Sequence, residues 1–399
     1  MTESRFAAVN ADLLAEQQLR APRSHPKGWE PGYTWDGTTG VFTTQPLAER
    51  PATWDEFIRD AGLDPDEVEV VGPVNVRGWD ANTGGGNIVR LHYYRLNLVR
   101  RAATSLPDIR TLMRQAKAAA RRKPKTPPEQ HERAVVVAFA DPQTGKTASR
   151  GGTPELIARV AATYERLGNY IADANADQGV WLDCGDAVES FENTSEQDQT
   201  NDLALMSQVE VVTALEFDGI DLLCRLLPRV VAAGVGSNHC RWRAGKNNKG
   251  TPADDWGLHI LRQMNYWTSR MGPAYEHLSF AIPQRHDETL ALDVCGSIIG
   301  LAHGHQVTRP NQIPDWWARQ QLGGQAVADA DILITGHWHH LRVEPVGRNP
   351  HTDRSRWWMS APTLDNGSDW FRRTKGYDSD PALMVLTVTR DGWDNLRLL

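Results

Sequence analysis

Beyond residue 134, short apolar segments alternate with longer amphipathic ones. The apolar segments predict strands at 134–140, 180–182, 230–235, 297–302 and 332–335. Between the first two strands, residues 154–174 repeat their apolar side chains at the spacing of a helix. Strands that alternate with helices are typical of a layered α/β fold. Three more strands, expected without long helices between them, lie at 341–346, 356–360 and 382–389 and favour a second, more antiparallel sheet packed on the first.

The first part of the chain has a different pattern. Residues 1–28 are predicted to form a polar arm. Thr53 is a candidate N-cap for a helix over 54–61, because Glu56 follows three residues later. β-branched and aromatic residues predict strands at 68–79 and 88–99, with a hairpin loop at the three glycines 84–86. We therefore expect a small α+β accessory domain over 29–120.

A basic, proline-rich segment separates the two patterns. Residues 106–122 have helical spacing and a basic face, and prolines at 124, 127 and 128 then end the helix. The composition of 121–133 predicts a solvated linker. The expected organisation is therefore an arm over 1–28, an accessory domain over 29–120, a linker over 121–133 and the larger α/β domain over 134–399.

Composition adds limits to this picture. A chain of 399 residues with 40% hydrophobic residues can form two domains with real cores. No apolar run approaches the roughly 20 residues that span a bilayer, and charges throughout residues 1–21 argue against a secretory signal. The four cysteines form no CxxC pair, which fits a reducing compartment. We predict a cytoplasmic protein without membrane contact, and the sequence predicts no oligomeric state.

The charge of the chain is unevenly distributed. The net charge is −7, yet residues 95–125 contain ten Lys/Arg and a single acid, Asp108. Such a basic segment predicts an anionic partner, and nucleic acid is the one we expect. The chain also has 15 tryptophans, most of which we expect in core packing, with base stacking as the alternative for exposed ones.

Each of the five predicted strands is followed by a residue type that binds metals. These residues are Asp141, Asp186, Asn238, His303, and the pair His337 and His339. In open α/β sheets, sites form at the carboxyl ends of strands, so we expect these side chains to converge. A single Asp or His at such a position is commonly a helix cap or a hydrogen-bonded structural residue, but their occurrence after five strands favours a metal site. Carboxylate, amide and imidazole ligands suit Mn²⁺, Fe or Zn²⁺ better than Mg²⁺ alone.

The pair at 337 and 339 is the strongest local signal. If strand geometry continues past residue 335, alternate residues would turn both imidazole rings to one face. Gly336 would also permit a turn that brings the backbone close to the metals.

The order of these motifs resembles the calcineurin-like metallophosphoesterase superfamily. The matching segments are Asp141-Pro142-Gln143, Gly185-Asp186, Ser237-Asn238-His239, His303-Gly304-His305 and Gly336-His337-Trp338-His339. The resemblance covers about residues 134–390 and implies a four-layer αββα sandwich. The superfamily includes DNA repair exonucleases, and relatives with a small added N-terminal domain occur in bacteriophage genomes. For a phage-encoded chain the expected location is the host cytoplasm.

The resemblance implies a role for each residue. Asp186 would bridge two divalent ions, with Mn²⁺ expected first and Fe, Zn²⁺ or Mg²⁺ as alternatives. Asp141, Gln143 and His339 would hold the first ion. Asn238, His303 and His337 would hold the second. His239 matches the family's proton donor, and His305 would contact phosphate or support the ligands.

Two positions depart from the family pattern. Gln143 stands where the family usually has histidine, so the first ion would be held more weakly. Ser237 replaces a glycine before the ligand asparagine, which is a milder change. The implied reaction uses two ions about 3.5–4 Å apart, whose bridging hydroxide attacks phosphorus while His239 protonates the leaving oxygen.

The loop after His239 suggests the kind of phosphoester. It contains Arg241, Arg243, Lys246 and Lys249 with glycines, which is typical of a mobile loop that contacts phosphates. Trp242 between two arginines suits base stacking. The ordinary alternative is a solvated loop. Three hypotheses follow: a phosphodiesterase or nuclease acting on DNA, a phosphomonoesterase acting on a nucleotide or phosphoprotein, and a catalytically weak metal-binding scaffold.

Overall fold

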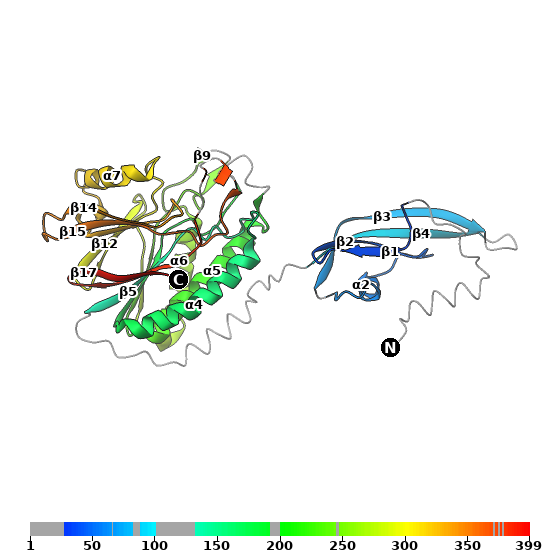
Figure 1. The fold of residues 1–399 in the computed structure, drawn as a ribbon, viewed down its shortest axis with the longest axis horizontal. Coiled ribbons are helices and arrows are strands. Elements are labelled where there is room, and N and C mark those ends of the chain that lie inside the picture. The colour runs from blue at the N-terminus through cyan, green and yellow to red at the C-terminus, as the bar shows by residue number, and fades with distance from the viewer. Residues whose placement is uncertain are drawn as a thin grey trace. The chain divides into compact units, whose positions relative to one another are not determined.

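The computed structural model describes residues 28–65, 67–82, 88–100, 132–191, 200–244, 247–369, 372–373, 376 and 379–399. The chain divides into two compact units, Met1–Thr104 and Ser105–Leu399 (Figure 1). The expected arm, the glycine loop at 84–86, the helix over 106–122 and most of the expected linker lie outside the described residues.

The N-terminal unit is built on one antiparallel sheet. Its elements are β1 (Gly32–Trp35), β2 (Thr39–Thr43), α2 (Asp55–Asp60), β3 (Val68–Asn82) and β4 (Ile88–Arg100). The strands pair in the order β1-β2-β4-β3. Ile58 of α2 packs with Leu96 and Leu98 of β4 in a small core. The predicted cap is wrong, because Trp54 rather than Thr53 precedes the helix and no side chain caps it.

The first sheet of the larger unit has four parallel strands at its centre and one edge. In order across the sheet, its strands are β10 (Leu278–Ala281), β7 (Val230–Gly234), β6 (Gln178–Asp183), β5 (Arg133–Phe139), β16 (Met384–Thr389) and β17 (Gly392–Leu398). The pairs from β10 to β5 are parallel, whereas β16 and β17 add antiparallel strands.

The second sheet has three parallel strands between two antiparallel edges. Its order is β11 (Thr289–Val294), β12 (Ser297–Ala302), β13 (Ile332–Thr335), β15 (Ser355–Ser360) and β14 (Arg342–Arg348). The short strands β8 (Arg243–Ala244) and β9 (Asn247–Asn248) pair apart from both sheets.

Helices cover the outer faces of the two sheets. They are α4 (Thr153–Ala174), α5 (Leu205–Leu226), α6 (Trp256–Thr268) and α7 (Ile313–Gln320), with 3₁₀ turns η2 (Gly272–Tyr275), η3 (Pro310–Gln312) and η4 (Ala326–Asp329). Figure 1 shows α4 and α5 on one side of the sheets and α7 on the other. No helix in the described part of the chain is long and apolar enough to cross a membrane.

Alternation along β5 explains the layers. Val135, Val137 and Phe139 face a core shared with α4, α5 and α6. Ala134, Val136 and Ala138 face the other way, into a core shared with the second sheet. A third core joins the second sheet to α7 through Trp317 and Trp358. Three cores between four layers make an αββα sandwich, as the resemblance implied.

The predicted strands of the larger unit are confirmed with small changes of boundary. Their expected division between the sheets is partly wrong, because β16 joins the first sheet whereas β12 and β13 join the second. The helix predicted at 154–174 is α4, and the strand predicted at 180–182 extends to 178–183. A short apolar run whose residues are all buried is typical of a central strand, which is covered on both faces.

Helix α5 approaches the first sheet closely at one glycine. A Cβ atom at Gly219 would overlap ring atoms of Trp181. The Trp181 side chain is fully buried and its ring lies 5.1 Å from that of Phe139. The helix–sheet contact therefore depends on the missing side chain at position 219.

We predict that Gly219→Ala lowers the free energy of unfolding by about 1–3 kcal/mol, because the added methyl group must displace Trp181. Thermal denaturation of the full chain measures this. Gly168→Ala is the matched control: Gly168 lies in α4, and a Cβ atom there would meet no atom within 4 Å, so the variant should gain about 0.5–1 kcal/mol from helix propensity. Equal effects of the two substitutions would contradict the packing argument.

Candidate metal centre

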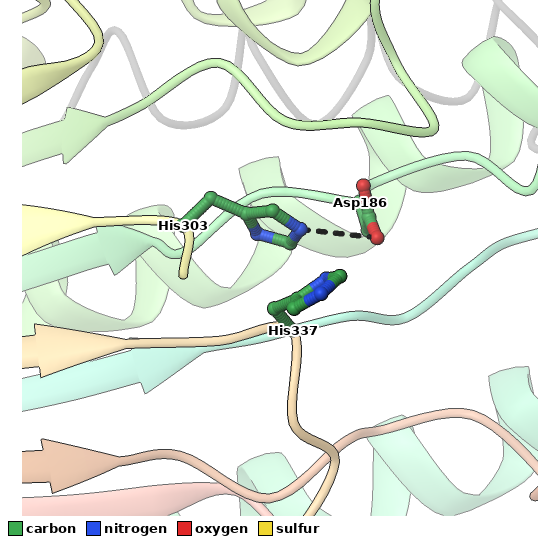
Figure 2. Close-up of side chains that lie close together, drawn as sticks. All are labelled: Asp186, His303 and His337. Carbon is green, nitrogen blue, oxygen red and sulfur yellow. Dashed lines mark ion pairs between the residues drawn. The ribbon is translucent and has the colours of Figure 1, made fainter. Parts of the chain in front are cut away.

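The predicted ligands come together where the two sheets end. Asp141, Asp186 and Asn238 follow β5, β6 and β7 of the first sheet. His303 and His337 follow β12 and β13 of the second sheet. Because these strands are parallel within each sheet, their carboxyl ends meet at one edge of the sandwich (Figure 2).

The backbone at this edge is unusual. Asp141, Gln143, Asp186, His337 and His339 have φ values of 48°, 39°, 53°, 68° and 60°. A non-glycine residue in the left-handed region costs energy and tends to occur at functional sites. The argument that His337 and His339 share a face by strand alternation is therefore wrong, because β13 ends at Thr335 and tight turns position both rings instead.

Gly336 has a different role from the one predicted. A Cβ atom there would lie 2.5 Å from Oδ2 of Asp141. The backbone N–H of His337 donates to both oxygens of that carboxylate, at 3.0 and 2.9 Å. Glycine is thus required for the close approach of Asp141, which ties the loop after β5 to the loop after β13.

Four of the predicted ligands form a compact set. Among the described residues, Asp186, His303 and His337 bring their donor atoms within 4.8 Å of one another. Nε2 of His303 lies 3.2 Å from Oδ2 of Asp186 and 2.9 Å from Oδ1 of Asn238. We refer to Asp186, Asn238, His303 and His337 as the histidine-rich set.

The histidine-rich set has the charge and geometry of a cation site. Nδ1 of His303 lies 2.8 Å from the carbonyl oxygen of Cys184, to which it donates its hydrogen. Nε2 of His303 then faces one oxygen of Asp186 and one of Asn238. All three atoms carry lone pairs, and only a proton or a metal ion between them satisfies all three. A hydrogen bond from the outer ring nitrogen to a backbone carbonyl is usual for histidines that bind metals.

The pKa shifts also indicate that the histidine-rich set favours a bound positive charge. Burial by itself would lower the pKa of His303, but the carboxylates of Asp186 and Asp141 raise it to about 9. Burial and the charge of His303 lower the pKa of His337 to about 2, so this ring is neutral and offers a lone pair. The set therefore fits a divalent ion with nitrogen and oxygen ligands.

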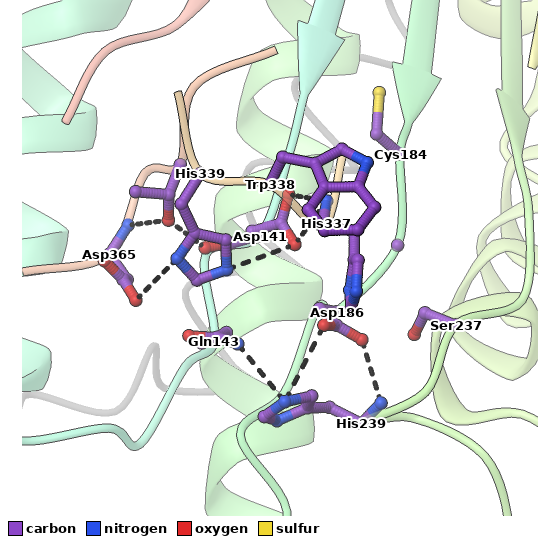
Figure 3. A network of polar contacts seen from close by, with 12 residues as sticks. Asp141, Gln143, Cys184, Asp186, Ser237, His239, His337, Trp338, His339 and Asp365 are labelled. Carbon is purple, nitrogen blue, oxygen red and sulfur yellow. Dashed lines mark hydrogen bonds and ion pairs between the residues drawn. The ribbon is translucent and has the colours of Figure 1, made fainter. Parts of the chain in front are cut away.

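The other predicted ligands are arranged differently (Figure 3). Nε2 of His339 lies 3.6 Å from Oδ1 of Asp141, and its Nδ1 lies 3.8 Å from Oδ2 of Asp365. The amide nitrogen of Gln143 lies elsewhere, 3.5 Å from Nε2 of His239. We refer to Asp141, Gln143 and His339 as the glutamine set.

A lysine that was not predicted from the sequence lies beside the glutamine set. Nζ of Lys146 donates to Oε1 of Gln143 at 2.6 Å and forms an ion pair with Asp365. Burial would lower the pKa of Lys146, but the carboxylates of Asp365, Glu189 and Asp141 raise it above its usual value. The ammonium group of Lys146 therefore already supplies a positive charge beside the glutamine set. For this reason the glutamine set fits a divalent ion less well than the histidine-rich set does.

His239 lies between the two sets. Its backbone N–H donates to Oδ1 of Asp186 at 2.9 Å, and its Nδ1 lies 3.2 Å from a carboxylate oxygen of Glu189. Burial would lower the pKa of His239, but Asp186 and Glu189 raise it to about 9. Glu189 was also missed from the sequence, and it orients the ring so that Nε2 faces the site.

The loop after His239 is less open to phosphates than expected. Arg241 pairs with Glu288 at 2.9 Å, and Arg243 donates to the carbonyl oxygen of Asn238 at 3.0 Å. Lys246 lies outside the described residues. The side chain of Trp242, in contrast, is 52% exposed and packs edge-on against Trp256.

His305 lies beside the histidine-rich set rather than in it. Its ring centroid is 5.3 Å from that of His303, and its Nε2 is 3.9 Å from a carboxylate oxygen of Glu288. Burial and the charge of His303 lower the pKa of His305 to about 4. A neutral ring at this position can meet a phosphoryl oxygen or support His303.

No protein-family model matches the chain, and no curated protein matches it. Among solved structures, a predicted phosphoesterase from Streptococcus pneumoniae TIGR4 is 11% identical, with 67% of this chain and 97% of that chain covered at a TM-score of 0.25. A purple acid phosphatase from yellow lupin is 13% identical, with 90% and 68% covered at 0.32. A metallophosphoesterase from Sphaerobacter thermophilus is 11% identical, with 67% and 88% covered at 0.29.

We predict that Asp186→Asn abolishes binding of Mn²⁺ while the chain stays folded. Asparagine tolerates the left-handed backbone at this position, so the substitution removes charge without adding strain. Isothermal titration with Mn²⁺ measures binding, and circular dichroism reports folding. Asp353→Asn is the matched control, because Asp353 has a φ of 56° and lies on the surface, paired with Arg348. Undiminished Mn²⁺ binding by Asp186→Asn would refute the assignment.

Proposed function

We propose that this chain is a metal-dependent phosphoester hydrolase and that its substrate is a phosphodiester of DNA. The observation that supports hydrolysis is the convergence of the histidine-rich set beside His239. This combination supports the motif resemblance to calcineurin-like metallophosphoesterases, which implies the same residues as metal ligands and His239 as the proton donor.

The chemistry divides between a metal ion and the chain. A divalent ion bound by the histidine-rich set would polarise a phosphoryl oxygen and lower the pKa of nearby water. Asp186 supplies one oxygen to that set and receives the backbone N–H of His239 on the other. One carboxylate would therefore hold the ion while it accepts a hydrogen bond from the backbone of the proton donor.

His239 is positioned to protonate the leaving oxygen. Its Nδ1 is directed at Glu189, so Nε2 is the ring atom that faces the reacting group. The two neighbouring carboxylates raise the pKa of the ring to about 9, which favours the protonated form. General acid catalysis of this kind typically contributes about 10²–10⁴-fold.

Two features support DNA as the substrate. Trp242 presents an exposed ring near the site, and stacking on such a ring tolerates any base. The basic segment 95–125 would add contacts to phosphates.

One observation favours a small phosphomonoester instead. Glu288 pairs with Arg241 and also lies near His305, so a carboxylate stands at the rim of the site. Because Glu288 occupies the guanidinium of Arg241, one cation fewer is available to a polyanionic backbone, and a single phosphoryl group needs this contact less. We therefore retain a phosphomonoesterase acting on a nucleotide or phosphoprotein as the second candidate.

We predict that His239→Asn lowers turnover of a nucleotide or alkyl ester by about 10²-fold or more, and turnover of an activated nitrophenyl ester much less. A poor leaving group needs the proton, whereas nitrophenolate does not. Steady-state rates with Mn²⁺ on both substrates measure the difference. His351→Asn is the control, since that ring is exposed and pairs with Asp329. Equal losses on both esters would assign His239 a binding role.

The choice of DNA is tested by binding and cleavage of a labelled oligonucleotide. Affinity should fall by about 0.7–0.9 log units per log unit of salt for each phosphate contacted. Trp242→Ala should weaken binding by about 5- to 150-fold, which corresponds to about 1–3 kcal/mol for one stacked base. Fluorescence anisotropy at several salt concentrations measures both effects.

Trp267→Ala is the control for this experiment. Trp267 is 40% exposed and lies near the far end of α6 from Trp256, at roughly 16 Å along the helix. Salt-independent binding, or hydrolysis of a nitrophenyl monoester far faster than of any oligonucleotide, would favour the phosphomonoesterase. Failure to hydrolyse either ester with Mn²⁺ would favour a metal-binding scaffold.

A further inference from the structure

The buried lysine in the glutamine set has no role in the reaction described above. The Lys146 side chain is 12% exposed, and that of its ion-pair partner Asp365 is 1% exposed. The two residues come from the loops after β5 and β15, so folding brings them together from opposite sheets. A buried ammonium group of this kind needs close anionic or carbonyl partners, and Lys146 has both kinds.

Contact with Lys146 determines what Gln143 can do. An ammonium group has only N–H donors, so the amide atom that faces it at 2.6 Å is the oxygen. The amide nitrogen then faces His239. Gln143 therefore uses its oxygen on a cation that belongs to the chain.

His339 completes this arrangement. Its two ring nitrogens face the carboxylates of Asp141 and Asp365, and Asp365 is the partner of Lys146. A divalent ion held by Asp141 and His339 would lie close to the ammonium group. In a buried site with a low effective dielectric constant, repulsion between these two cations is strong.

The histidine-rich set differs in this respect. The donor atoms of Asp186, His303 and His337 lie within 4.8 Å of one another. Among the described residues, no lysine forms a hydrogen bond or ion pair with these side chains, and Arg243 donates to the backbone carbonyl oxygen of Asn238. The two sets, which the family resemblance makes equivalent metal sites, therefore differ in the charge that is already present.

We propose that the ammonium group of Lys146 takes the place of one of the two metal ions, so that the chain binds a single divalent ion, at the histidine-rich set. This inference rests on the proposed function, because it assumes that the histidine-rich set binds a metal. The ammonium group balances the carboxylates Asp141 and Asp365 in the half of the site where the resemblance places the first ion.

The number of bound ions tests the inference. We would measure Mn²⁺ per chain by elemental analysis after dialysis, and by calorimetric titration, for the full chain and three variants. Lys146→Met removes the ammonium group at similar length. Lys146→Met with Gln143→His also restores the histidine of the family pattern. Lys249→Met is the matched control, because that lysine is exposed.

We expect a single Mn²⁺ ion per chain in the unaltered protein and in Lys249→Met. The double variant should bind a second ion, and Lys146→Met alone should bind it more weakly. Paramagnetic resonance gives an independent readout, since an isolated Mn²⁺ ion and a magnetically coupled pair have different spectra. At saturating Mn²⁺ the coupled spectrum should appear in the double variant and in Lys146→Met, but not in the unaltered protein or in Lys249→Met.

Two results would overturn the inference, and they differ in what they mean for the proposed function. Two ions of similar affinity in the unaltered protein would remove the role of Lys146 and leave the metal-dependent hydrolase intact. Absence of any bound ion would remove both. If circular dichroism shows that the lysine variants do not fold, the stoichiometry and spectrum of the unaltered chain and of Gln143→His decide the question, because with Lys146 present both should hold a single uncoupled ion.

Discussion

The carboxylate of Asp186 must be balanced by positive charge in a place that water does not reach. Its side chain is 1% exposed, and an unpaired buried carboxylate would cost several kcal/mol. Burial would raise the pKa of Asp186, but His303 and His239 hold it well below its usual value. The residues that perform this task come from the loops after β7 and β12, so the neutralisation of one side chain joins the ends of both sheets.

The sandwich fixes the positions of His239 and His303 relative to Asp186. Alternate side chains of β5 fill the helix-side core and the core between the sheets, so a shift by one residue would exchange the two faces. The parallel registers of β5 with β6 and of β12 with β13 then place the following loops at one edge. Strained turns at Asp141 and His337 then orient the side chains. The backbone N–H of His337 donates to the carboxylate of Asp141 and joins the two turns.

The strands and the polar residues that follow them could be predicted from the sequence for a physical reason, whereas the four layers were implied by the motif resemblance. Buried strands such as residues 332–335 are short apolar runs, and the polar residue after each run marks the edge of the sheet. The partners within the site could not be predicted in this way. Lys146 and Asp365 are separated by 219 positions and lie in loops, so no local pattern connects them. Glu189 and Glu288 resemble ordinary surface acids until the fold places them beside His239 and Arg241. The turn at His337 and His339 was also missed, because left-handed residues in a loop follow no periodicity.

The ion pair between Lys146 and Asp365 differs from a metal site in how it can be lost. A chelator removes a metal ion, and a cell short of manganese leaves such a site empty. The lysine is attached to the backbone and cannot be removed in either way. Half of the pocket therefore keeps its charge balance, and the loops after β5 and β15 stay joined, when no free metal is present. An ion that returns needs to organise only the histidine-rich half, which lowers the entropy lost on binding. For such a chain, metal starvation would switch off activity without dismantling the site.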